Sequence, residues 1–273
     1  MGLVGRVRAS VVVLAVLPSV LEAQPATAVV KRSPASPAVA IADSLLGAGD
    51  LPGSYAVLAA RLAEAPDDYE ARWRATRSAL GMGIVGTTHE ARRTWLRVAD
   101  AHGRDLLRLR PNTPDAMAWA AAARGRRALG EDGMRTVARL AKETWILTGR
   151  ILALEPDHAL ANEVRGKAHQ EAARMPTVTR FFARMLMGNA LMDEASRWDM
   201  AERHLLRAIA SDPGLVMSYL DLGESYGYQR KWTEAEATYR RGLAVRPRYP
   251  VDEKLKSIMR ERLAALPSSS GGR

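Results

Sequence analysis

The chain has 273 residues, 47% of them hydrophobic and only 5% aromatic, which excludes a wholly disordered chain and is enough for one or two domains with a sizeable core. No Cys is present, so disulfides, thiolate metal sites and cysteine nucleophiles are excluded. The net charge of +10 admits a polyanionic partner, such as a nucleic acid, an anionic glycan or a lipid headgroup.

The N-terminal residues 1–23 follow the pattern of a bacterial export signal. Two arginines precede an apolar run over residues 11–21, and the small residue Ala23 comes shortly after it. The run is too short for a membrane-spanning helix, which needs roughly 20 apolar residues. We therefore predict a signal peptide over 1–23, with cleavage after Ala28 as the alternative, and a mature protein that is periplasmic or secreted and has no membrane span.

A change in composition marks the boundary between a linker and a helical domain. Residues 24–40 hold three prolines among Ala, Ser and Val, which predicts an extended linker. From Ile41 onward, apolar residues recur at three- and four-residue spacing without the alternation that is typical of strands. We expect a helical repeat domain over 41–266, followed by a flexible tail over 267–273.

A pattern of apolar residues near the C-terminus is written twice. Six positions within 198–213 recur within 232–247, 34 residues later, which is the period of the tetratricopeptide helix–turn–helix repeat. A repeat of this kind cannot bury its apolar face alone, so it must stack on its neighbours and form a solenoid. The fold we predict is all-α, a tetratricopeptide-like α-solenoid of stacked helical hairpins. Ala201 and Ala235 should lie where two helices approach closely.

The earlier units are longer and predict some extended helices. Pro66, Pro111 and Pro156 each end an apolar-periodic stretch and lie 45 residues apart. Relative to the shorter repeat, each of these hairpins gains about three helical turns. The next unit, which ends at Pro213, has room for an inserted helix. The helices we expect span 69–80, 89–110, 115–129, 134–154, 158–175, 178–191, 198–211 and 250–266.

No motif predicts a catalytic, metal or cofactor site. Gly81, Gly83 and Gly86 spell a dinucleotide-binding pattern, but that pattern requires a preceding strand, and here it joins two helices. We interpret these glycines as a helix C-cap and loop. The five histidines lack a zinc-ligating spacing, and Glu70 and Glu143 have Arg four positions away, which predicts surface ion pairs. We therefore expect no enzyme activity and no cofactor.

The concave surface of the last complete repeat is the predicted partner site. In a tetratricopeptide repeat the second, fifth, ninth and twelfth positions of the first helix line this surface, and here they are Met217, Leu220, Glu224 and Gly227. A groove for a peptide C-terminus needs Lys and Asn, because a buried carboxylate must be paired. This repeat offers apolar groups and an acid instead, so we predict a peptide with basic and apolar groups. The alternative is that Met217 and Leu220 only contact the neighbouring repeat.

The region 111–266 resembles a known family. Three segments carry the resemblance, namely 152–157 (LALEPD), 219–223 (YLDLG) and 250–255 (PVDEKL). They are similar to the regulator of microtubule dynamics family, a tetratricopeptide-like group with bacterial members. The resemblance implies a helical repeat fold. The name of the family implies microtubule association, although an exported bacterial protein would not meet microtubules.

Two functions are compatible with these patterns. The leading hypothesis is a non-enzymatic scaffold in the cell envelope that binds a protein or peptide partner in its concave groove, with no nucleic acid involved. The alternative is Arg-driven binding of anionic envelope polymers or lipid headgroups. Only six of the 40 basic residues are Lys, and a composition so rich in Arg and Ala is also typical of a GC-rich genome. The positive charge therefore has a compositional explanation as well as a functional one.

Overall fold

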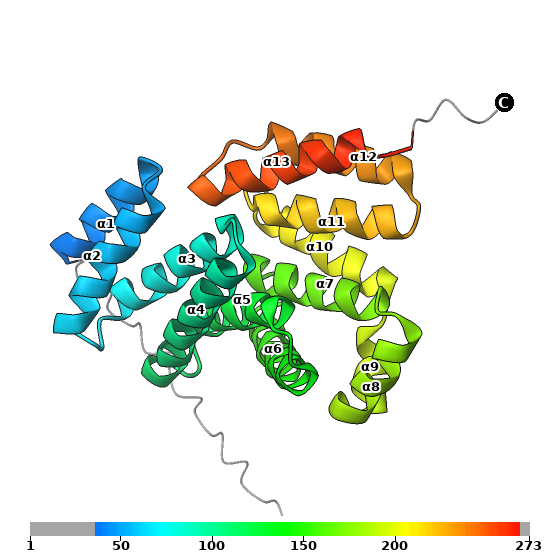
Figure 1. Ribbon diagram of the computed structural model, residues 1–273, viewed down its shortest axis with the longest axis horizontal. Helices are drawn as coiled ribbons and strands as arrows, with labels where there is room; N and C mark the ends of the chain where they lie inside the picture. The colour runs from blue at the N-terminus through cyan, green and yellow to red at the C-terminus, as the bar shows by residue number, and fades with distance from the viewer. Residues whose placement is uncertain (1–35, 268–273) are drawn as a thin grey trace, which may run out of the picture. The chain divides into compact units, whose positions relative to one another are not determined.

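A computed structural model describes residues 36–267, which form thirteen helices and no strands (Figure 1). The predicted all-α fold is confirmed, and α6 and α10 begin and end where the sequence predicts. In chain order the helices are α1 (Pro37–Gly47), α2 (Leu51–Glu64), α3 (Tyr69–Val85), α4 (His89–Leu109), α5 (Pro114–Gly130), α6 (Met134–Leu154), α7 (Ala159–Ala173), α8 (Thr177–Met187), α9 (Asn189–Ala195), α10 (Trp198–Ser211), α11 (Val216–Tyr228), α12 (Trp232–Ala244) and α13 (Pro250–Ala264).

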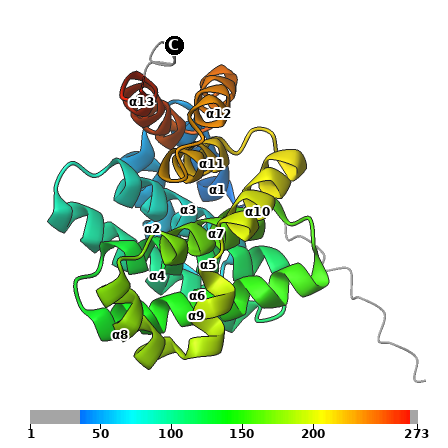
Figure 2. The same cartoon turned by 90° about the vertical axis from the view of Figure 1, so that its right-hand side faces the viewer.

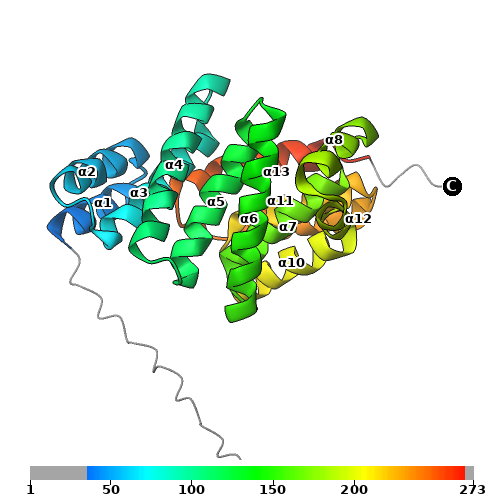
Figure 3. The ribbon, with the colours of Figure 1, turned by 90° about the horizontal axis from the view of Figure 1, so that it is seen from below.

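The helices pair as hairpins that stack on one another. The pairs α1–α2, α3–α4, α5–α6, α7–α10 and α11–α12 are in close contact, and each hairpin also contacts the next one. Figure 3 shows the long helices α4, α5 and α6 lying side by side. Because successive hairpins bury each other's apolar faces, the core consists of several clusters along the stack.

Side-chain caps and prolines set where the helices begin. The side chains of Asp50, Asp68 and Thr88 each accept a hydrogen bond from the backbone N–H three residues later, at the start of α2, α3 and α4. Proline occupies the first turn of α1, α2, α5 and α13, where its missing N–H costs nothing. The recurring Pro and Asp residues of the sequence are thus boundary signals.

Small residues allow close approach between helices. A Cβ atom at Gly103 of α4 would lie 3.0 Å from the Cα of Ala120 in α5, so these two backbones are nearly in contact. Ala201 and Ala235, predicted at close helix contacts, are both fully buried. Helices of this chain, which has few aromatic residues, therefore pack closely through Ala and Gly.

Helix α3 is longer than the sequence predicts and contains two of the three motif glycines. It continues to Val85, so Gly81 and Gly83 lie inside the helix and only Gly86 is its C-cap. A Cβ atom at Gly83 would lie 2.7 Å from the Leu96 side chain, so glycine is needed there for the contact with α4. The interpretation of all three glycines as cap and loop is wrong for Gly81 and Gly83.

The helix predicted over 178–191 is in fact two helices. Helix α8 ends at Met187 and α9 begins at Asn189, with Gly188 between them at φ +98°. A left-handed backbone of this kind favours glycine and cannot continue an α-helix. The single inserted helix is therefore wrong, and the chain turns at Gly188.

The predicted terminal segments lie largely outside the described residues. The signal peptide over 1–23 falls in the undescribed residues 1–35, as does most of the linker, and the tail continues into 268–273. Helix α1 begins at Pro37, inside the linker predicted over 24–40, because proline is well suited to a first helical turn. Within 36–267, no helix combines the length and the apolar character needed to cross a membrane.

The last helix contacts both the C-terminal hairpin and the second hairpin of the stack. Helix α13 contacts α11 and α12, and it also contacts α3 near the start of the domain. Ile84 of α3 packs against the apolar cluster formed by α10 to α13, and the Arg77 guanidinium lies 5.0 Å from the Tyr249 ring centroid. Helix α13 therefore borders the same side of the stack on which α3, α5, α7 and α11 meet.

Candidate functional site

The structure places the four predicted groove residues of α11 in three different environments. Leu220 is only 6% exposed and belongs to the core cluster of the C-terminal repeats. Met217 is half-buried and packs against the same cluster. A Cβ atom at Gly227 would meet only open space. Glu224 is engaged by other helices, so partner binding at these four residues stays a prediction.

Glu224 is part of a buried charge network that links α5, α7 and α11. The Lys167 ammonium lies 2.8 Å from Asp221, 3.2 Å from Glu224 and 3.3 Å from Glu171. The Arg126 guanidinium lies 2.7 Å from Glu163 and 3.0 Å from the same Asp221. Because Asp221 is shared by both cations, the network forms one unit. At its rim, Arg174 pairs with Glu171 and Arg262 of α13 approaches Glu224.

Burial and pairing split the pKa values of the two most buried carboxyl groups of this network. Burial raises the pKa of Glu163 to about 8. The positive charge of Arg126 lowers this pKa, and the negative charge of Asp221 raises it further. Burial acts in the same direction on Asp221, but the charges of Lys167 and Arg126 outweigh it and lower the pKa of Asp221 to about 2. Burial disfavours the Lys167 ammonium, yet Asp221, Glu224 and Glu171 raise its pKa above the ordinary value. Among these groups burial therefore favours the protonated form of Glu163, while pairing favours the charged forms of Asp221 and Lys167.

The charge count of the network does not by itself assign this proton. With every group ionised, Arg126 and Lys167 face four negative charges, on Glu163, Asp221, Glu224 and Glu171, and the rim arginines Arg174 and Arg262 add two positive charges. The burial of Glu163, and not the overall count, therefore favours its protonated form. Shifted pKa values often mark catalytic sites, but structural ion-pair networks shift them equally. Each of these groups is held by partners from another helix, which is what a structural network requires.

A cavity of about 210 Å³ lies beside this network, between α5, α6, α7 and the α8–α9 segment. Its walls are mostly apolar, and its charged end is formed by Arg126, Glu163, Lys167 and Glu171. Ala and Gly open the space, while three methionines supply flexible, polarisable walls. The apolar lining residues are Ala122, Gly125, Ala128, Leu129, Val137, Ala141, Trp145, Val164, Ala168, Ala172, Met175, Met187, Met192 and Ala195.

Helix α8 directs its apolar side away from this cavity. Its inner face is formed by Ala183, which is buried against α6, α7 and α9, and by Met187, which lines the cavity. On the outer face Val178 is 70% exposed, Phe181 60% and Met185 69%, and Phe182 and Leu186 are also exposed. These five positions recur at three- and four-residue spacing, so they form one stripe along the helix. We call them the α8 stripe.

Polar contacts fix α8 in this orientation. The Arg180 guanidinium donates hydrogen bonds to the backbone carbonyls of Ala173 at 2.8 Å and Met175 at 3.1 Å, where α7 ends. Arg184 pairs with Asp193 of α9. The apolar stripe therefore faces solvent while the opposite face of α8 is held by both neighbouring helices. Solvent-exposed apolar patches of this kind mark interaction sites in soluble proteins.

The buried histidines do not form a metal site. His169 and His204 stack with ring centroids 5.5 Å apart, and their Nδ1 atoms contact the Ala195 carbonyl and the Asn162 side chain. Burial lowers the pKa of both histidines to about 4, so both are neutral at pH 7. Among residues 36–267, no three His, Asp or Glu side chains are grouped as metal ligands. These histidines are packing residues between α7 and α10.

The comparisons with known proteins agree with the fold. The model of the family described as Regulator of microtubule dynamics protein 1-3 matches residues 38–267. A thermophilic tetratricopeptide protein of Thermus thermophilus, TTC0263, is 18% identical, with 83% of this chain and 97% of that chain covered and a TM-score of 0.57. MamA is 16% identical, with 80% and 97% covered and a TM-score of 0.38.

The TTC0263 structure supports a shared fold alone at this level of identity, and no argument rests on MamA at its TM-score. No curated protein matches the chain. The family match spans nearly all of the described helices. It includes the charge network, the cavity and the α8 stripe. The chain belongs to the Regulator of microtubule dynamics protein 1-3 family.

Proposed function

We propose that the chain is a non-enzymatic scaffold that binds a protein partner through the α8 stripe. The observation that carries this proposal is the exposure of five large apolar side chains on one face of an 11-residue helix. Solvent exposure of such a contiguous face is unfavourable in an isolated monomer, and burial against a partner relieves it. The proposal moves the partner contact from the concave surface of α11, where Leu220 is buried, to α8.

The stripe fits an amphipathic helix of the partner best. Residues at positions i, i+3, i+4, i+7 and i+8 of one helix form the ridge that packs against a second helix. Val178, Phe181, Phe182, Met185 and Leu186 have this spacing. Two aromatic rings at the centre supply the large, rigid contact area that dominates most interfaces.

Binding of a membrane surface is the second candidate function. A helix with Phe, Met and Leu on one side and Arg on its flanks also has the character of an interfacial helix, and the chain is basic overall. Vesicles of phosphatidylglycerol distinguish the two functions. Binding to these vesicles that disappears with added salt supports the lipid candidate.

Site-specific photo-cross-linking tests the protein partner directly. A photoreactive phenylalanine analogue in place of Phe181, in the full chain in its native cell, should capture one protein. Mass spectrometry should map the cross-link to an amphipathic helix of that protein. The matched control carries the analogue in place of Leu154, which is 61% exposed at the end of α6. Equal capture by the two positions would show that the α8 stripe has no preferred partner.

The captured partner then allows a binding measurement. Replacing both Phe181 and Met185 with Ser should weaken its affinity by at least about 2 kcal/mol, because aromatic residues at the centre of an interface carry most of its energy. Calorimetry with the purified full chain measures this change. The control pair Ile146→Ser and Leu154→Ser removes equally exposed apolar groups from α6. A control variant that loses as much affinity would contradict a site on α8.

We further propose that the scaffold acts outside the cytoplasm. Support for this comes from the basic residues and short apolar run within 1–23. N-terminal sequencing of the protein from the envelope or culture medium should give a chain that starts near Gln24, or at Val29 for the alternative cleavage site. An intact Met1 in the cytoplasmic fraction would exclude export.

A further inference from the structure

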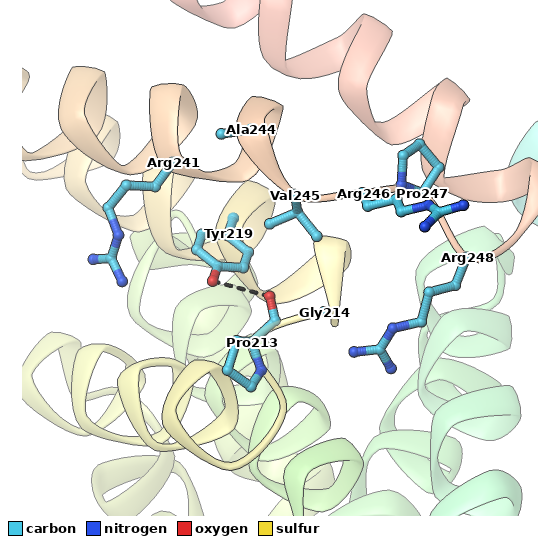
Figure 4. A pocket seen from close by; sticks show the side chains of 9 residues that line it. All are labelled: Pro213, Gly214, Tyr219, Arg241, Ala244, Val245, Arg246, Pro247 and Arg248. Atoms are coloured by element: carbon cyan, nitrogen blue, oxygen red, sulfur yellow. Dashed lines mark hydrogen bonds between the residues drawn. The ribbon is translucent and has the colours of Figure 1, made fainter.

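A basic cleft lies between two loops of the C-terminal repeats (Figure 4). One wall is the loop between α10 and α11, and the other is the loop between α12 and α13. The cleft is shallow and open, with a volume of about 810 Å³. The residues that line it are Pro213, Gly214, Tyr219, Arg241, Ala244, Val245, Arg246, Pro247 and Arg248.

Arg248 is fixed at one side of this cleft. Its guanidinium forms a two-pronged ion pair with the carboxylate of Asp212 across the two loops. The same carboxylate accepts a hydrogen bond from the backbone N–H of Gly214 at 3.0 Å. A Cβ atom at Gly214 would collide with the Arg248 guanidinium, so a larger residue there would displace this guanidinium from its present position. The cation is thus held in place before any ligand arrives.

The other two arginines of the cleft have no acidic partner. Arg241 and Arg246 are exposed, and neither contacts a carboxylate within residues 36–267. Figure 4 shows Arg241 and Arg248 on opposite sides of Pro213 and Tyr219. The buried Lys256 ammonium donates to the Val245 carbonyl and so offsets the negative end of α12. The cleft therefore carries a surplus of positive charge.

The residue after the helix-ending proline differs between the loops. Asp67, Asn112, Asp157 and Gly214 follow the prolines of the earlier units. Asp67 and Asp157 each pair with an arginine of the next repeat, Arg108 and Arg207. After Pro247 the corresponding position is Arg248, so the last loop has a cation where two of the earlier loops have an acid.

We propose that this cleft binds an acidic, extended segment of a partner protein. Carboxylates spaced along such a segment can pair with Arg241, Arg246 and Arg248, and charge-assisted hydrogen bonds to arginine are the strong ones. The floor formed by Pro213, Ala244 and Val245 offers apolar contact for the side chains between them. The site is separate from the α8 stripe, because α8 and α9 lie far from α12 and α13 in Figures 1 and 2.

The chemistry of the cleft favours this occupant over other anions. A single-stranded nucleic acid needs exposed rings for base stacking, but Tyr219 is buried, and its hydroxyl donates to the Pro213 carbonyl. A membrane surface needs exposed apolar anchors, and the exposed large apolar residues of 36–267 lie outside the lining. The chain itself cannot supply the acid from its undescribed ends, where Glu22 is the sole carboxylate side chain among five Arg and Lys residues.

The test uses a fluorescein-labelled peptide in which five Glu residues alternate with Pro and Ala, and a second peptide with Gln in place of each Glu. Fluorescence anisotropy with the full chain should show roughly tenfold tighter binding of the Glu peptide, decreasing with added salt. The double variant Arg241→Ala and Arg246→Ala should reduce Glu-peptide affinity by roughly tenfold. Its circular dichroism should be unchanged, because neither side chain makes an ion pair.

The matched control is the double variant Arg135→Ala and Arg260→Ala, which removes the same charge from exposed residues of α6 and α13. It should bind the Glu peptide like the wild type. An equal loss in both double variants, or equal affinity for the Glu and Gln peptides, overturns the proposal. A single-stranded oligothymidine that competes fully with the Glu peptide would reassign the cleft to nucleic acid. The α8 variants should bind the Glu peptide normally, so this test and that of the proposed function fail independently.

Discussion

Replacing Lys167 with Met should lower the free energy of unfolding by about 3–5 kcal/mol. The Lys167 ammonium is the common partner of Asp221, Glu224 and Glu171, and its side chain is only 13% exposed. Met keeps most of the apolar stem, so the variant removes the charge with little change in packing. The loss arises because the three carboxylates then have only one cation each, Arg126, Arg174 or Arg262, and keep the desolvation cost that Lys167 offset. Urea unfolding followed by circular dichroism at pH 7 measures it.

A second lysine provides the control for this experiment. Lys231 also pairs with a carboxylate, Glu202 at 3.0 Å, but its side chain is 40% exposed. Lys231→Met should therefore cost less than about 1 kcal/mol, as is usual for pairs in contact with solvent. Adding Glu224→Gln to Lys167→Met should recover part of the loss, because it removes a carboxylate whose remaining partner is Arg262 at the rim. A Lys167→Met protein as stable as the Lys231→Met protein would show that the network contributes little to stability.

The sequence predicts the repeat stack well because its signals are local. The 34-residue offset between 198–213 and 232–247 and the prolines that end each hairpin can be found in the sequence without knowledge of tertiary contacts. Helices such as α6 and α10 accordingly have the predicted bounds. Gly188 is the informative exception. A single glycine in an apolar-periodic stretch is compatible with a helix, and only the left-handed backbone at this position separates α8 from α9.

The charge network could not be predicted from sequence patterns. Its members are far apart in the chain, since Lys167 and Glu224 are separated by 57 residues and Arg126 and Asp221 by 95. Each residue alone resembles a solvent-exposed charge on an amphipathic helix. What buries them is the stacking of α5, α7 and α11, which depends on the superhelical geometry of the whole domain. Glu224 was therefore predictable as a residue of the inner surface, whereas its ion pairs were not.

The α8 stripe was visible in the sequence as an apolar pattern, but its direction was not. Apolar residues at helical spacing normally face the core, and the sequence pattern assigns no solvent-facing side to the helix expected over 178–191. In the structure the core-facing positions are instead Ala183 and Met187. Arg180 supports this orientation by capping the end of α7. The polar residues that hold α8 against α7 and α9, Arg180 and Arg184, therefore determine which face of α8 meets solvent.

The second large expected effect is the pH dependence of the free energy of unfolding that Glu163 causes. Burial raises the pKa of Glu163 to about 8, well above the value of a carboxyl group in an unfolded chain. A group with a raised pKa stabilises the fold below the unfolded pKa, and this contribution is lost as the pH rises through the folded pKa. The wild-type protein should therefore lose stability between about pH 4.5 and pH 8 through this group. The unfolded state binds fewer protons than the folded state throughout this window.

Glu163→Gln should remove this pH dependence, because glutamine has the shape of a protonated glutamic acid and does not titrate. At pH 8 the variant should be more stable than the wild type by on the order of 3 kcal/mol, and near pH 5 the two should be similar. The window from pH 6.5 to 8 is the most informative, since burial lowers the pKa of His102, His169 and His204 to about 4 and they are neutral there.

Urea unfolding of the wild type and of Glu163→Gln at pH 5, 6.5 and 8 tests this prediction. The control Glu236→Gln alters an exposed carboxylate that pairs with Arg240, and it should leave the pH profile of the wild type unchanged. Parallel profiles for Glu163→Gln and the wild type would mean that Glu163 is ionised in the folded protein. The network would then hold Arg126 and Lys167 against four anions, Glu171 included, and the balance would have to come from the rim arginines Arg174 and Arg262. Charge neutrality inside the repeat stack would in that case depend on side chains that solvent can reach.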